Sequence, residues 1–211
     1  MDEKTRMILK TLDEMYPEAM AELDFRSAYE LLVATVLSAQ CTDVRVNLIT
    51  AELFKEADTP ERMVALGVPR IRESIKTCGM YQMKSKYLYE LSRILVERFD
   101  SQVPRTIEEL TQLPGVGRKT ANVVVSNAFG VPAIAVDTHV FRVSNRLGLA
   151  RAREVRATEE ALMAKVPRER WTKLHHQLIF LGRRICKARS PLCEECPLKG
   201  LCDDYQKRSI R

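Results

Sequence analysis

Four cysteines near the C-terminus have a spacing that suits metal binding. They follow the pattern Cys-x6-Cys-x2-Cys-x5-Cys and are Cys186, Cys193, Cys196 and Cys202. Four thiolates in so short a segment can surround one soft metal ion or an iron–sulfur cubane. Structural zinc more often uses two short Cys-x2-Cys clips, and only one short clip is present here. The spacing by itself therefore leaves zinc and an iron–sulfur cluster as alternatives.

A lysine beside a glycine-rich turn is the second candidate for chemistry. Lys119 lies in the segment Leu113–Ala121, where Pro114, Gly115 and Gly117 predict a tight hairpin that opens a helix. The N-terminus of a helix offers backbone N–H groups to a phosphate, and its dipole disfavours an ammonium ion. This position, together with partial burial, would favour a neutral amine, which is a nucleophile. Alternatively, Lys119 only contacts a phosphate.

A carboxylate follows shortly after this helix. Asp137 comes directly before a helical pattern that begins at Thr138, so its side chain can cap that helix. It can also accept a proton or stabilise positive charge in a transition state. Both roles can hold together, because a capping side chain is held in a fixed orientation. We expect the neighbouring His139 to be a packed residue and not a base.

These residues must be positioned by helices. Apolar residues recur with helical spacing along most of the chain, and no convincing period-two alternation is found. The run Leu31–Leu37 is apolar on all sides and predicts a buried central helix behind a capping box of Ser27 and Glu30. In the first half of the chain, the sequence also predicts a first helix to about Glu22, a helix ending near Gly67, a helix from Pro69 ended by Gly79 and a long helix towards Phe99. In the second half, it predicts a loop over 150–156, a helix from Thr158 to Val166 and a helix opened by Pro167.

The composition favours a folded protein with a polyanionic partner. The chain has 211 residues, of which 45% are apolar and 29% charged, and a formal net charge of +6. Such a charge favours nucleic acid first and an anionic membrane surface second. No run approaches the ~18 apolar residues of a membrane span, and the charged segment 1–6 does not resemble a signal peptide. We therefore expect a cytoplasmic, nucleoid-associated protein with reduced thiols, in which Cys41 and Cys78 are small buried apolar residues.

Three separated motifs resemble one known family. The segments Leu113–Ala121 and Val136–Val143 look like the helix-hairpin-helix and Gly/Pro-Asp signature of the endonuclease III family. Leu37–Gln40 and the cysteine spacing also match in order and distance, so the resemblance covers nearly the whole chain. It implies an all-α, two-lobed helix-hairpin-helix DNA glycosylase fold with a [4Fe-4S] cluster. The implied domains are a six-helix domain over 21–131 and a discontinuous four-helix iron–sulfur domain over 1–20 and 132–211.

The resemblance also implies a reaction. Members of this family are base-excision enzymes, so we expect a bifunctional N-glycosylase and AP lyase that removes oxidised pyrimidines from duplex DNA. Lys119 would form a Schiff base with the sugar, and Asp137 would support the reaction. Related adenine-mismatch glycosylases lack a lysine at this position. The rival functions are a DNA-binding module without activity and a monofunctional glycosylase for another lesion.

The same resemblance suggests how the chain meets damaged double-stranded DNA, which we expect it to bind as a monomer. Gln40 would enter the duplex and face the orphaned base, and Met80, where the family often has leucine, would wedge from the other side. The loop between the first two cluster cysteines would present basic groups to the backbone. For each of these residues, an ordinary surface position is the alternative. The expected DNA contacts are Gln40, Met80, Gly115, Gly117, Arg118, Lys187 and Arg189.

Overall fold

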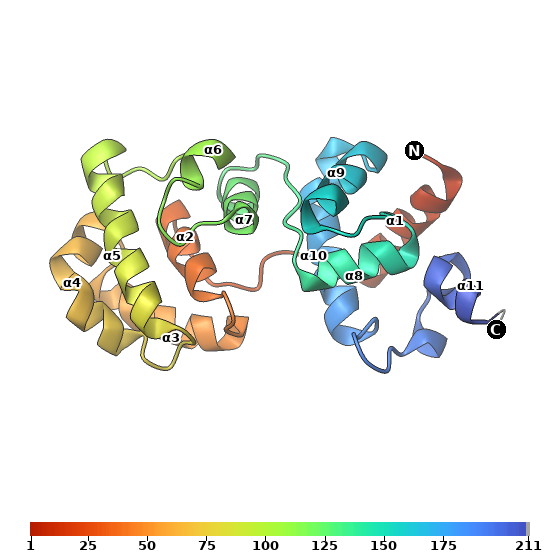
Figure 1. The fold of residues 1–211 in the computed structure, drawn as a ribbon, viewed down its shortest axis with the longest axis horizontal. Helices are drawn as coiled ribbons and strands as arrows, with labels where there is room; N and C mark the ends of the chain where they lie inside the picture. Colours follow the sequence, from red (N-terminus) through yellow and green to blue (C-terminus); the bar gives the residue numbers. More distant parts are fainter. Residues whose placement is uncertain (210–211) are drawn as a thin grey trace. The chain divides into compact units, whose positions relative to one another are not determined.

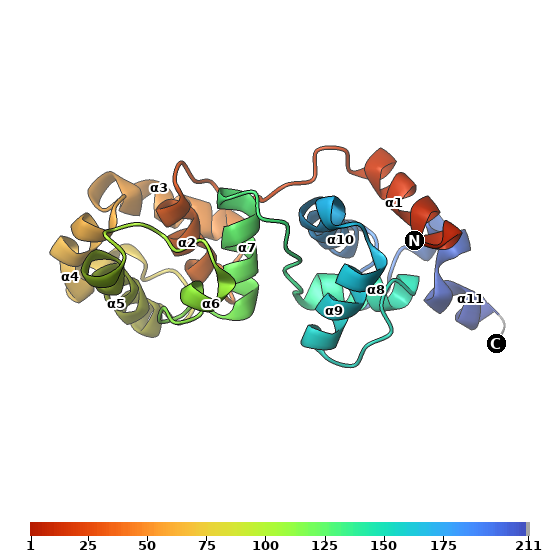
Figure 2. The ribbon, with the colours of Figure 1, turned by 90° about the horizontal axis from the view of Figure 1, so that it is seen from above.

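The computed structural model describes residues 1–209 and confirms the all-α prediction, with no strand in that range. The chain divides into two compact units, which we call the hairpin unit (Glu22–Val131) and the cluster unit (Met1–Ala21 with Pro132–Arg211). The hairpin unit contains α2 (Ala28–Leu37), α3 (Asp43–Glu56), α4 (Pro60–Ser74), α5 (Tyr81–Arg98), α6 (Ile107–Leu110) and α7 (Arg118–Ala128) (Figure 1). The cluster unit contains α1 (Glu3–Met15), α8 (Thr138–Leu147), α9 (Val155–Lys165), α10 (Trp171–Arg184), α11 (Asp203–Ser209) and three short 3-10 helices, η1 (Arg168–Arg170), η2 (Cys193–Glu195) and η3 (Lys199–Leu201) (Figure 2).

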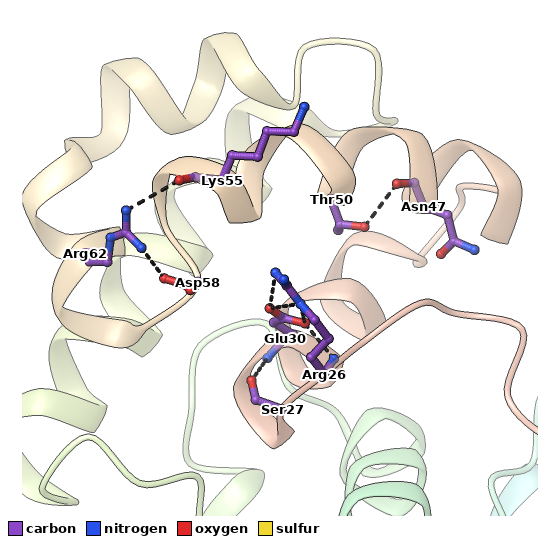
Figure 3. A network of polar contacts seen from close by, with 8 residues as sticks. All are labelled: Arg26, Ser27, Glu30, Asn47, Thr50, Lys55, Asp58 and Arg62. Atoms are coloured by element: carbon purple, nitrogen blue, oxygen red, sulfur yellow. Dashed lines mark hydrogen bonds and ion pairs between the residues drawn. The ribbon is translucent and has the colours of Figure 1, made fainter.

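The hairpin unit is built around α2, as its apolar sequence predicts. Every residue from Tyr29 to Leu37 is buried, and α2 contacts α3, α5 and α7. The hydroxyl of Ser27 accepts a hydrogen bond from the Glu30 N–H at 3.1 Å, which confirms the predicted cap. The Glu30 carboxylate accepts a hydrogen bond from the backbone N–H of Arg26 at 2.6 Å (Figure 3). In a capping box the donor would be the N–H of Ser27, one residue later. The cap therefore also fixes the chain that enters α2.

Two glycines shape the course of α4. Gly67 has φ 74° and ψ 157°, so it breaks α4 into the two helical pieces that the sequence predicts around Pro69. The second piece ends at Ser74, and the prediction that Gly79 ends it is wrong. Gly79 instead lies in the following turn, where a Cβ would come within 3.0 Å of the Gln40 carbonyl oxygen. It is needed for a close approach of two loops.

Some predicted helix ends in the cluster unit also differ from the structure. The first helix, α1, ends at Met15 because Pro17 follows, and not near Glu22. Helix α9 begins at Val155 inside the predicted loop, and the Thr158 hydroxyl donates to the Glu154 carbonyl at 2.9 Å within its first turn. Helix α11, which follows the last cysteine, has no counterpart among the helices predicted from the sequence. The core of this unit is formed by apolar side chains of α1, α8, α9 and α10, and α8 contacts α9, α10 and α11.

None of the helices within residues 1–209 combines the length and the apolar character that crossing a bilayer requires.

An ionic cluster joins α1 to α10 inside the cluster unit. The carboxylate of Asp13 accepts two hydrogen bonds from Arg170, at 2.7 and 2.8 Å. It accepts a third from Gln177 at 3.0 Å, and Lys173 lies 3.2 Å away. Burial raises the pKa of Asp13, but these partners outweigh it and lower the pKa from 3.8 to about 2. The ionised carboxylate therefore stabilises the folded state.

Replacing Asp13 with asparagine is expected to lower the free energy of unfolding by about 1–2 kcal/mol near neutral pH. Because the pKa of Asp13 is lower in the folded protein, its contribution is complete above about pH 4 and disappears as the pH falls towards 2. The difference between the variant and the wild type should shrink over this range in urea titrations. Glu14→Gln is the matched control, since the Glu14 side chain is exposed and pairs with the exposed Lys10 across 4.0 Å, so this variant should show neither effect. A difference that is constant with pH would contradict the prediction.

Candidate functional site

The hairpin is a tight turn that opens α7. Gly115 has φ 78°, and a Cβ there would lie 2.8 Å from Cδ2 of Tyr87, so the turn requires glycine on both counts. Gly117 has an ordinary φ of −87° and is the N-cap of α7 without a side-chain cap. Apart from Gly117 itself and its two chain neighbours, no heavy atom of residues 1–209 lies within 4 Å of a Cβ built at Gly117. The approach to the first turn of α7 is therefore open to an incoming group.

Lys119 is the second residue of α7, directly behind this open turn. Its side chain is exposed, so the partial burial that would favour a neutral amine is not found at this residue. Arg118, the first residue of the helix, is half-buried. The amine of Lys119 lies at the positive end of the α7 dipole and is free to reach a ligand.

Asp137 and His139 belong to the cluster unit, at the start of α8. Asp137 is half-buried, and its Oδ1 accepts a hydrogen bond from the Val140 N–H at 2.7 Å, which confirms that it caps α8. The ring of His139 lies against Gly182 of α10, where a Cβ would come within 2.9 Å of Nδ1. The same nitrogen lies 3.2 Å from the Arg142 guanidinium. His139 is a packed residue, as expected.

Gln40 and Met80 lie on two adjacent loops of the hairpin unit. Both side chains are exposed, and Met80 has 55% of its surface accessible. Both residues have a positive φ, 55° for Gln40 and 57° for Met80, which is uncommon for residues other than glycine. The loops touch where Gly79 meets the Gln40 carbonyl. An exposed polar and an exposed apolar side chain are thus presented from one region.

The four C-terminal cysteines line one cavity in the cluster unit. All four are half-buried thiols, and the rest of the lining combines apolar residues such as Leu147, Leu181 and Ile185 with the polar residues Arg146, Lys199, Asp204 and Tyr205. Burial raises the pKa of the Cys196 thiol, and the other three cysteines raise it further. Four thiolates can share this space only if positive charge compensates them. The cavity is therefore built for a metal centre.

Two kinds of centre use four thiols of this type. A single zinc ion takes four ligands at about 2.3 Å from one point. A [4Fe-4S] cluster is likewise held by four cysteine thiolates. The four half-buried thiols therefore fit either centre, as their spacing does.

Two arginines of α8 hold the loop that carries the first cysteine, a role that was not predicted from the sequence. Arg142 donates to the Cys186 carbonyl at 3.0 and 3.1 Å and to the Gly182 carbonyl at 3.0 Å. Arg146 donates to the Lys187 carbonyl at 2.8 Å and lies 3.4 Å from the Cys186 sulfur. The signal in the sequence was their spacing of four residues, which places both on one face of an amphipathic helix.

Lys187 and Arg189 are exposed on this anchored loop. Their backbone is held close to α8, while their side chains extend from it. The loop can therefore present two positive charges to a polyanion without being mobile at its base.

Comparison with known proteins identifies the family. Residues 33–168 match the model of the HhH-GPD superfamily of base excision DNA repair proteins, and residues 186–202 match the iron–sulfur binding domain of endonuclease III. Endonuclease III of Bacillus subtilis (strain 168) is 52% identical over 201 residues, which cover 95% of this chain and 92% of that protein. This chain belongs to the endonuclease III family. Endonuclease III of Escherichia coli (strain K12) is 47% identical over 203 residues, 96% of each chain.

Solved structures agree with this assignment. The structure of a trapped endonuclease III–DNA covalent intermediate matches over 100% of both chains, with a TM-score of 0.92 and 47% identity. A thermostable thymine-DNA glycosylase matches over 97% of both chains, with a TM-score of 0.86 and 26% identity. As a member of the endonuclease III family, the chain is a DNA glycosylase with AP lyase activity. Its cofactor is a [4Fe-4S] cluster, which settles the alternative that the cysteine spacing left open.

The purified protein is accordingly expected to be yellow-brown, with a broad absorption at the edge of the visible range. Cys196→Ser should remove most of this absorption and the bound iron, because Cys196 is one of four thiols that face the cavity. Cys41→Ser is the matched control, because Cys41 belongs to the hairpin unit. This variant should keep both the absorption and the bound iron. A colourless wild-type protein that contains zinc would contradict the assignment.

Proposed function

We propose that this enzyme removes oxidised pyrimidines from duplex DNA and cleaves the strand with Lys119 as the nucleophile. The observation that carries the proposal is the place of Lys119, an exposed amine in the first turn of α7 behind an open glycine turn. A helix N-terminus attracts a phosphate, and an amine beside it can reach the sugar that the phosphate carries.

In this proposal, the neutral amine of Lys119 attacks C1′ of the damaged nucleotide. The bond from C1′ to the base breaks, and the base leaves with the electron pair and takes up a proton. The amine then gives up a proton, the C1′–O4′ bond breaks as O4′ takes up a proton and the sugar ring opens, and an iminium links enzyme and sugar. The iminium acidifies the C2′ proton, whose removal expels the 3′ phosphate by β-elimination. Water then hydrolyses the Schiff base and releases the enzyme.

Asp137 would support this reaction with its charge. A carboxylate beside the sugar stabilises the positive charge that develops as the base leaves, or accepts a proton in the same step. The hydrogen bond to the Val140 N–H holds the carboxylate in one orientation, as a preorganised group requires. Capping and catalysis are thus assigned to the same side chain.

The proposed DNA interface combines the two exposed loop residues with the basic and glycine residues already described. We propose that the enzyme acts as a monomer on damaged double-stranded DNA in the cytoplasm, in association with the nucleoid. A formal net charge of +6 supports binding to the phosphate backbone, and this binding should weaken with salt. The interface residues are Gln40, Met80, Gly115, Gly117, Arg118, Lys187 and Arg189.

Borohydride trapping tests the proposal. The wild-type enzyme, incubated with a duplex that contains an abasic site, should give a covalent adduct because borohydride reduces the iminium. A panel of duplexes with oxidised pyrimidines or oxidised purines should show base release and strand cleavage for the pyrimidines. Base release without strand cleavage would indicate a monofunctional glycosylase. Binding without either reaction would indicate a DNA-binding module.

A further inference from the structure

Lys84 of α5 is a buried lysine whose three donors are all used. Only 3% of its surface is exposed, although lysine is almost never fully buried unless it is paired. Its Nζ donates to the Leu37 carbonyl at 2.8 Å, to the Ala39 carbonyl at 2.5 Å and to the Cys78 sulfur at 3.2 Å. A lysine ammonium has three N–H groups and no acceptor, so the number of partners matches the number of donors.

Two of these partners lie where α2 ends. Leu37 is the last residue of α2, whose final turn contains no basic residue. The carbonyl end of a helix carries partial negative charge and favours a cation. Lys84 therefore supplies from α5 the positive charge that α2 lacks. Cys78 completes the arrangement, because its thiol donates to the Leu37 carbonyl at 3.3 Å while its sulfur accepts from Lys84.

The same residue connects the loops of Gln40 and Met80. Through its side chain, Lys84 binds the carbonyl of Ala39, the residue directly before Gln40. Its backbone N–H donates to the Met80 carbonyl at 3.0 Å, which is the first intrahelical hydrogen bond of α5. The Lys84 side chain therefore ties the Gln40 loop to the turn of α5 that follows Met80.

The conformation of both loops needs such support. Gln40 and Met80 each adopt a positive φ, which persists in residues other than glycine only where the surroundings fix it. Met80 is the N-cap of α5 and makes no side-chain cap hydrogen bond. Gly79 lies against the Gln40 carbonyl, so neither loop can shift without disturbing the other. The contacts of Lys84 fix the carbonyls on both sides of this junction.

We propose that Lys84 is a positioning residue that holds Gln40 and Met80 in the geometry with which the enzyme enters the duplex. The inference rests on the proposed role of Gln40 and Met80 in DNA insertion. Lys84 touches neither the substrate nor the reacting atoms in this proposal. It acts by keeping the loops preorganised, so that binding energy is not used to order them.

The test compares Lys84→Met with Lys86→Met in the full-length protein with its cluster. Lys86 lies two residues further along α5 and is exposed, so it controls for the loss of one lysine from the same helix. The probe is a duplex with a tetrahydrofuran abasic analogue and 2-aminopurine opposite the gap, whose fluorescence reports its stacking. This analogue needs no reaction at Lys119, so failure of the lyase proposal would not affect the measurement.

Lys84→Met is expected to bind this duplex about tenfold more weakly and to reduce the fluorescence change at saturating protein. Binding to the single-stranded oligonucleotide, which needs no insertion, should stay within about twofold of the wild type. Lys84→Arg should restore part of the amplitude, because it keeps buried donors. If Lys84→Met does not fold, Lys84→Gln, which retains two donors, provides the same comparison. Lys86→Met should match the wild type in every respect.

A saturating fluorescence change equal to that of the wild type, or an equal loss of duplex and single-strand binding, would overturn the proposal. Gln40→Ala separates this failure from failure of the insertion role. A normal amplitude in Gln40→Ala would show that Gln40 does not fill the gap. A reduced amplitude in Gln40→Ala with a normal amplitude in Lys84→Met would show that the loops hold their geometry without Lys84.

Discussion

Lys119→Ala is expected to abolish the covalent adduct that borohydride traps on abasic DNA, while binding to the same duplex persists. Without the amine, no iminium can form, and β-elimination loses its electron sink. The substitution should leave the fold intact, because Lys119 is exposed and alanine is the residue that helices favour most. Trapping and gel-shift measurements on one duplex give both results. Adduct formation that survives the substitution would contradict the role of Lys119.

Lys119→Arg is the matched variant that tests the alternative role. An arginine keeps the positive charge and can still contact a phosphate, but in proteins it stays protonated and cannot act as a nucleophile. We expect Lys119→Arg to bind the duplex like the wild type and to give no adduct. If Lys119 served only to contact a phosphate, this variant would retain strand cleavage.

Asp137→Asn is expected to slow base removal by about 10²–10⁴-fold. Asparagine caps helices as well as aspartate does, so the hydrogen bond to the Val140 N–H should survive while the negative charge is lost. The thermal midpoint should therefore change little. Single-turnover base release and thermal unfolding, measured on the same preparation, separate the two roles of the side chain.

Asp137→Ala removes both the charge and the cap. It should match Asp137→Asn in base release but lose about 1 kcal/mol of stability. Normal base release in Asp137→Asn, combined with a loss of stability in Asp137→Ala, would leave Asp137 with a structural role alone.

Local signals in the sequence determined several features of the protein. The apolar run of α2 predicts its burial, the glycines of the hairpin predict the start of α7, and Ser27 and Asp137 predict helix caps. These features depend on residues within a few positions of one another, so the chain itself supplies the information. The cysteine spacing likewise predicts a metal centre, although the choice of an iron–sulfur cluster followed from the family resemblance.

Other features depend on residues that are distant in the sequence, and only the tertiary structure revealed them. Lys84 reaches carbonyls more than forty positions away, and Arg142 and Arg146 bind a loop about as far along the chain. No local pattern shows that Lys119 is exposed or that Gly79 meets the Gln40 carbonyl. Burial and close approach are set by which helices pack together. The sequence therefore determined the groups that can do chemistry, and the packing of the helices decided which residues hold them in place.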